Sequence, residues 1–174
     1  MNASARRTDL CGLLAAVSVV LLMMGSLIPA ALYACPILAM AALLPVREQF
    51  GSGAALTTYA AVSLLAVLLA TDKELALLYV FFGWYVPAQP ALDKLRPRFL
   101  GAAVKLLLAN GAMLTLYALL LWVFRLPSVT EELAGLNALW LSVLLLSANA
   151  LFVLTDIFLH RLARKWNARF ARRS

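Results

Sequence analysis

Six apolar runs, separated by short polar stretches, fill almost the whole of this chain. A helix needs about 20 apolar residues to cross a bilayer, and runs of this kind predict membrane-spanning helices. The runs are 10–28, 30–44, 54–70, 75–92, 100–124 and 133–159. Proline punctuates three of them: Pro29 follows the first, Pro36 lies in the second, and Pro87 and Pro90 end the fourth. We therefore predict an all-α integral membrane bundle of six transmembrane helices, occupying residues 1–159.

The composition excludes a soluble protein. Hydrophobic residues make up 64% of the 174 residues and charged residues 13%, with a mean hydropathy of +0.91. Soluble domains contain about 45–50% apolar and about 25% charged residues, and a soluble fold this apolar could not cover its surface. The six runs also leave no room for a separate soluble domain.

The basic residues predict the orientation. Cytoplasmic loops of membrane proteins are enriched in Lys and Arg. With the N-terminus inside, twelve basic residues fall in inner stretches: Arg6, Arg7, Arg47, Lys94, Arg96, Arg98, Arg161, Arg164, Lys165, Arg169, Arg172 and Arg173. The outer loops then hold only Lys73 and Arg125. This sorting predicts a multi-pass membrane protein with both termini inside, and the family resemblance given below implies the bacterial cytoplasmic membrane.

The tail at 160–174 predicts a basic amphipathic helix continuing the sixth span. Apolar residues recur at helical spacing, with basic residues on the other side: Leu159, Leu162, Ala163, Trp166 and Phe170. We expect this helix to lie against anionic lipid headgroups. The alternative is a docking surface for a cytoplasmic protein.

Neither the charge nor the motifs indicate nucleic acid or catalysis. The net charge is +7, but the basic residues lie in the short stretches between apolar runs, as expected for a membrane protein. We therefore expect no nucleic-acid partner. Cys11 and Cys35 lie in apolar runs and His160 is the only histidine. The chain has no metal-ligand spacing, P-loop or nucleophile motif. We expect no enzyme activity, no catalytic residues, no metal and no cofactor.

Polar residues at membrane depth are functional candidates, because burying them in lipid is costly. Lys105 lies about 7–8 Å from the inner end of the fifth span, and Asp156 about 4–5 Å from the inner end of the sixth. These positions allow an intramembrane ion pair. The alternative is that Lys105 extends to the inner headgroups by itself.

Asn110 and Asn149 lie at matching depth, each about 15 Å from the inner end of its span. Two interpretations are open. Their amides could hydrogen-bond each other, which stabilises membrane bundles by about 0.6–2 kcal/mol, or they could face a cavity and hold a polar group of a ligand.

Small residues four apart predict surfaces where helices approach closely. Gly12 and Ala16 form one such ridge in the first span, and Ala30 and Ala34 form another in the second.

The layout resembles a known family. A turn at Gly51–Gly53 leads into the third span, Thr71-Asp72-Lys73-Glu74 opens the fourth, Gly83-Trp84-Tyr85-Val86-Pro87 closes it, and Lys105 and Asn110 follow in the fifth. With six short spans and no energy-coupling motif, the chain resembles the substrate-binding (S) components of energy-coupling factor (ECF) importers. It is also similar to small uncharacterised Firmicute membrane proteins related to them.

The resemblance implies an S component that captures a vitamin-like solute. It would dock on a transmembrane T subunit driven by two cytoplasmic ATPases. In that family the docking ridge is usually an alanine-x3-alanine pair on the first span, whereas here the first span has Gly12 and Ala16. The solute-binding site would be lined by aromatic rings and amides. These are Tyr79, Trp84, Asn110, Tyr117, Trp140 and Asn149. The alternative function is a structural or regulatory membrane protein without a small-molecule ligand.

Overall fold

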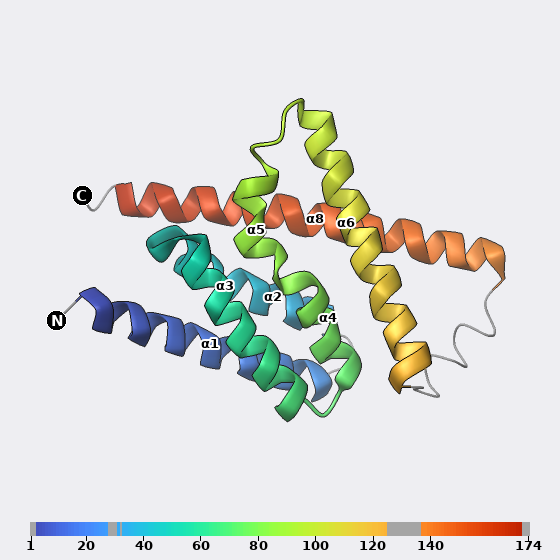
Figure 1. Cartoon of the computed structure of the whole chain (residues 1–174), viewed down its shortest axis with the longest axis horizontal. Helices are drawn as coiled ribbons and strands as arrows, with labels where there is room; N and C mark the ends of the chain where they lie inside the picture. Colours follow the sequence, from blue (N-terminus) through green and yellow to red (C-terminus); the bar gives the residue numbers. More distant parts are fainter. Residues whose placement is uncertain (1–2, 28–30, 32, 125–136, 172–174) are drawn as a thin grey trace. The chain divides into compact units, whose positions relative to one another are not determined.

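The computed structural model describes residues 3–27, 31, 33–124 and 137–171, and every regular element in these ranges is a helix (Figure 1). The helices are α1 (Ala3–Leu27), α2 (Ala34–Ala42), α3 (Leu44–Leu69), α4 (Lys73–Gly83), α5 (Tyr85–Leu92), α6 (Arg98–Leu119), the π-helical turn η2 (Leu120–Phe124) and α8 (Ala138–Ala171). The predicted all-α class is confirmed for this part of the chain.

Five helical stretches among the described residues are long and apolar enough to cross a membrane. They are Ala5–Ser26, Leu44–Leu69, Lys73–Leu92, Phe99–Trp122 and Leu139–Ala168. By length and composition, these helices indicate a multi-pass membrane protein. The predicted span 30–44 is not among them.

Helix α2 is too short to cross a bilayer. Its nine residues extend about 13–14 Å along the helix axis, and the hydrocarbon layer is about 30 Å thick. Leu43 keeps helical angles (φ −76°, ψ −18°) between α2 and α3, so the chain passes almost without interruption into Leu44. Ala30, the predicted start of this span, lies outside the described residues.

Gly51 divides α3 into two arms. Its φ of 85° and ψ of 172° are not helical, and a positive φ of this kind favours glycine. Val46 before Gly51 and Ala54 after it belong to one buried cluster, although a straight helix would separate them by about 12 Å. The chain therefore changes direction at Gly51, where the sequence predicts a polar turn before the third span. Figure 1 shows the course of α3.

The chain divides into two compact units, which are described separately. The first comprises Met1–Ala91 with Phe158–Ser174, and the second comprises Leu92–Ile157. In the first unit, α1 packs against α2, α3 and α4. A Cβ added at Gly25 of α1 would lie 2.7 Å from Leu75 and 2.8 Å from Cys35. The absence of a side chain at Gly25 thus allows α1, α2 and α4 to approach closely.

The junction between α3 and α4 is capped from both sides. The Asp72 carboxylate accepts a hydrogen bond from the Glu74 amide (3.0 Å) and begins α4 as its N-cap. The Lys73 ammonium donates to the carbonyls of Val67 (2.9 Å) and Ala70 (3.0 Å) at the end of α3. A cation at this end also complements the helix dipole.

The predicted fourth span consists of two short helices, α4 and α5, that meet at Trp84. Pro87 has no N–H group, so it cannot bond the carbonyl four residues before it, and the helical pattern is interrupted at this point. Pro90 lies inside α5 and removes a second backbone donor. The sequence predicts a span interrupted by proline here, and the structure has that interruption between α4 and α5.

The second unit contains α6, η2 and the first part of α8. Helix α6 and η2 together match the predicted fifth span. The predicted start of the sixth span at Leu133 lies outside the described residues, and α8 begins at Ala138. From there α8 continues without a break through the predicted boundary at residue 159 to Ala171.

Candidate functional site

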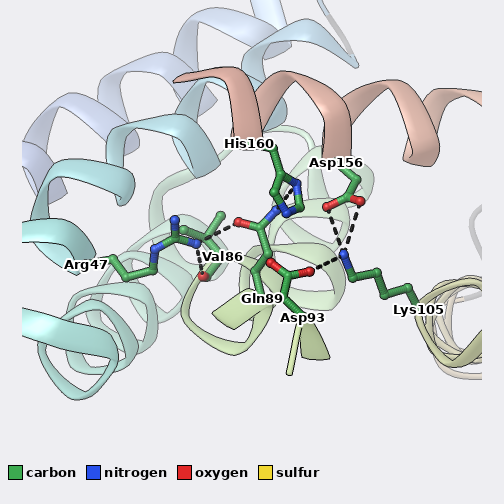
Figure 2. A network of polar contacts seen from close by, with 7 residues as sticks. All are labelled: Arg47, Val86, Gln89, Asp93, Lys105, Asp156 and His160. Atoms are coloured by element: carbon green, nitrogen blue, oxygen red, sulfur yellow. Dashed lines mark hydrogen bonds and ion pairs between the residues drawn. The ribbon is translucent and has the colours of Figure 1, made fainter. Parts of the chain in front are cut away.

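In the second unit, Lys105 of α6 forms two ion pairs (Figure 2). Its ammonium lies 2.6 Å from an Asp93 carboxylate oxygen and 3.2 Å from an Asp156 carboxylate oxygen of α8. The Lys105 side chain is 11% exposed. Because water reaches its ammonium poorly, the two nearby carboxylates stabilise the charged form. Of the two alternatives for Lys105, the structure has the ion pair, and Asp93 adds a second partner.

Asn110 and Asn149 hydrogen-bond each other in the same unit. The Asn110 amide nitrogen donates to the Asn149 carbonyl oxygen (2.8 Å), and the Asn149 nitrogen donates back to the Asn110 oxygen (3.1 Å). Each nitrogen also donates to its own helix, to the carbonyls of Leu106 and Leu145 respectively. Both donors of each amide are therefore used within the protein.

In the first unit, Arg47 is buried and bonds to a backbone carbonyl that has lost its usual partner. Its Nη1 donates to the Val86 carbonyl (2.9 Å) and to the Gln89 side-chain oxygen (2.7 Å), as Figure 2 shows. In a regular helix the Val86 carbonyl would accept from the residue four positions on. That residue is Pro90, which has no N–H group. The guanidinium of Arg47 thus replaces the hydrogen bond that Pro90 removes from α5.

The remaining bonds of this network reach the C-terminal part of α8. Arg47 donates from Nε and Nη2 to one Glu48 oxygen (3.0 and 2.7 Å), and the other Glu48 oxygen accepts from Asn167 (2.8 Å). The amide nitrogen of Gln89 lies 3.0 Å from Nδ1 of His160 (Figure 2). His160 and Asn167 are seven residues apart, so they lie on one face of α8. We call these five side chains the Arg47 network.

The aromatic candidates Tyr79 and Trp84 lie in the first unit. The Tyr79 ring is fully buried, with its centroid 5.9 Å from that of Tyr59. Tyr59 donates from its hydroxyl to the Val80 carbonyl, whereas the Tyr79 hydroxyl has no hydrogen-bond partner among the described residues. The Trp84 indole N–H donates to the Phe81 carbonyl (2.6 Å). Tyr79 therefore has a buried hydroxyl donor that no described residue uses.

The other four predicted solute contacts lie in the second unit. Asn110 and Asn149 form the pair described above, Tyr117 is half-buried, and Trp140 is 58% exposed. Of these four residues, the structure brings Asn110 and Asn149 into direct contact.

The predicted docking ridge on α1 is open. Gly12 and Ala16 are exposed, and a Cβ added at Gly12 would meet nothing within 4 Å. Ala34 on α2 is exposed as well, and Ala30 lies outside the described residues. The small residues of α1 therefore have two different environments: Gly25 is packed against neighbouring helices, and Gly12 is open.

Six participants were not identified from the sequence as site residues: Arg47, Glu48, Gln89, Asp93, His160 and Asn167. The sequence places Arg47 among the inner-loop cations, because it lies in a polar stretch between two apolar runs. A glutamine and a proline together inside an apolar span, Gln89 and Pro90, are the signal that could have identified a buried donor nearby. Asp93 follows the fourth span directly and offered no comparable pattern.

Comparisons found no match to this chain among family models, curated proteins or solved structures. Among the described residues, no group of three or more His, Cys, Asp or Glu side chains is placed to hold a metal ion.

Proposed function

We propose that this protein is the membrane-embedded substrate-binding subunit of an ECF-type uptake transporter for a vitamin-like small molecule. In this proposal the chain crosses the membrane six times with both termini inside. The two arms that meet at Gly51 then belong to different crossings: α2 with residues 44–50 forms the second, and residues 52–69 form the third. Separate ATPase subunits, acting through a transmembrane T subunit, supply the energy. The basis is the layout of the chain, which is an argument by analogy of fold.

The observation that carries the proposal is the open surface of α1 around Gly12 and Ala16. Leu13 and Val17 beside them are exposed as well, at 62% and 42%. A partner helix could approach this surface to a short distance, because no side chain of the described residues stands over Gly12. This is the kind of surface by which an S component would contact its T subunit.

The solute is proposed to bind at the break between α4 and α5. Discontinuous helices mark substrate sites in many transporters, because a broken helix exposes polar groups within the membrane. Tyr79 lies five residues before Trp84, and its hydroxyl can donate to a ligand oxygen or nitrogen. The Asn110–Asn149 pair, Tyr117 and Trp140 remain candidates for the solute contacts of the second unit.

Affinity purification in mild detergent from the native host tests this proposal. The wild-type protein should bring down a T-type membrane subunit, two ATPases and a small molecule, all identified by mass spectrometry. Replacing Gly12 and Ala16 with Leu should remove the protein partners, because the added side chains fill the open surface. Gly53→Leu is a matched control, since Gly53 is also exposed with nothing within 4 Å, and it should keep them. Purification of the wild type without these subunits would contradict the proposal.

A second candidate is a structural or regulatory membrane protein without a ligand. The observation in its favour is that Asn110 and Asn149 use their donors on each other and on their own helices. Replacing both asparagines with Leu distinguishes the two functions. A solute-binding pair would lose its ligand in this variant, whereas a structural pair would lose thermal stability with no change in the small molecules that co-purify.

A further inference from the structure

The C-terminal part of α8 has one basic, exposed face. Arg161, Arg164 and Lys165 are all exposed, and their spacing of three and four residues places them on one side of the helix. Leu159, two residues before Arg161, is fully buried. This segment of α8 thus has a packed side and a basic side.

The Arg47 network fixes which side faces outward. His160 is joined to Gln89 of α5, and Asn167 is joined to Glu48 of α3. These two contacts, seven residues apart, fasten the same face of α8 at two points within the first unit. Arg161 and Lys165 are turned about 100° and 140° away from His160, so they are directed away from the fastened face.

The basic face begins where a membrane crossing would end. The apolar stretch of α8 starts at Leu139, and about 20 residues are enough to cross the hydrocarbon layer. A crossing that starts at Leu139 ends near Phe158, three residues before Arg161. The abundant anions at that depth are the phosphate groups of lipids.

We propose that the exposed face formed by Arg161, Arg164 and Lys165 binds the phosphate groups of anionic phospholipids. Guanidinium groups can bond phosphate oxygens bidentately, and each basic residue near an anionic membrane surface strengthens attachment. The proposal is independent of the importer function, since it rests on the tail and on the network that orients it.

Titration of the full-length protein with phosphatidylglycerol tests this surface. The protein is held in mild detergent, and native mass spectrometry measures the fraction with lipid bound. Phosphatidylcholine and inorganic phosphate are the comparison probes. Replacing Arg161 and Lys165 with Gln should weaken phosphatidylglycerol binding about fivefold for each charge removed, or about thirtyfold for both.

Two further variants make the result specific. Lys94→Gln with Arg96→Gln removes the same charge from exposed positions outside the tail, and it should leave the affinity for phosphatidylglycerol unchanged. Arg161→Lys with Lys165→Arg keeps the charge, and it should retain binding within a factor of about two, which separates loss of charge from loss of folding.

Three outcomes would overturn the proposal. The Lys94 and Arg96 variant could lose as much affinity as the tail variant, which would make net charge the cause. Inorganic phosphate could compete as well as the lipid, which would indicate a site for a free anion. An acidic protein could be lost from purified preparations of the tail variant while lipid binding stayed constant, which would make the face a protein-docking surface.

Discussion

The substitution Arg47→Leu tests whether a buried guanidinium compensates for a proline inside a membrane helix. The side chain of Arg47 is 7% exposed, and two of its four hydrogen bonds go to buried acceptors on α5, the Val86 carbonyl and the Gln89 oxygen. Leucine fills similar space but donates nothing. Both acceptors would therefore lose this donor in a region with little access to water.

The expected cost follows from these two acceptors. Losing a hydrogen bond to a buried acceptor costs about 1–3 kcal/mol, so the two bonds together contribute about 2–6 kcal/mol. Removing the charge also removes the penalty for burying it, which offsets part of this cost. We expect Arg47→Leu to lower the free energy of unfolding by about 1–5 kcal/mol. Unfolding by sodium dodecyl sulfate in mixed micelles, followed by tryptophan fluorescence, measures the change.

A second substitution isolates the contribution of the Val86 carbonyl. Pro90→Ala restores a backbone N–H four residues after Val86, where a helical hydrogen bond can form again. The double variant should therefore regain about 1–3 kcal/mol of the stability lost in Arg47→Leu, beyond the effect of Pro90→Ala alone. If Pro90→Ala changes stability equally in the presence and absence of Arg47, the carbonyl is not what Arg47 stabilises and the reasoning is refuted.

Two other predictions concern helix contacts. Asn110→Leu alone should destabilise the protein by about 1–2 kcal/mol in thermal unfolding, because Asn149 loses its partner. The variant with both asparagines replaced by Leu should lose less stability than the two single variants added together. Additive losses would argue against the pair. Gly25→Ala should cost about 1–3 kcal/mol, because its methyl group would lie within 2.8 Å of Leu75 and Cys35 atoms. Unchanged stability of that variant would contradict the close helix contact.

Depth within a helix was the part of the site that the sequence predicted best. Counting residues from the end of each apolar run placed Asn110 with Asn149 and Lys105 with Asp156. The structure brings both pairs within hydrogen-bond distance. The method works here because a helix rises by a constant 1.5 Å per residue. Two residues at equal depth on helices adjacent in sequence need only face each other to meet.

The Arg47 network could not be predicted in this way. Its members come from α3, α5 and α8, and their contacts depend on the turn at Gly51 and on the break at Trp84. Hydropathy assigns the short polar stretch around Arg47 to a loop, because it depends only on residues close in sequence. It cannot show that segments far along the chain bury Arg47. The helix bounds show the same effect. The second predicted span ends at Leu44, yet helical structure continues beyond it as far as the kink at Gly51.

The turn at Gly51 decides whether the number of membrane crossings in the proposed arrangement is even or odd. Without the turn, Leu44–Leu69 would be a single helix of 26 residues, about 39 Å long, which is one crossing rather than parts of two. In the six-crossing arrangement proposed above, the loss of one crossing would make the number odd. Every segment after the third helix would then face the opposite compartment, including the basic tail. In that arrangement, the side of the membrane reached by the C-terminus would depend on the turn at one residue with a positive φ, more than a hundred positions before it.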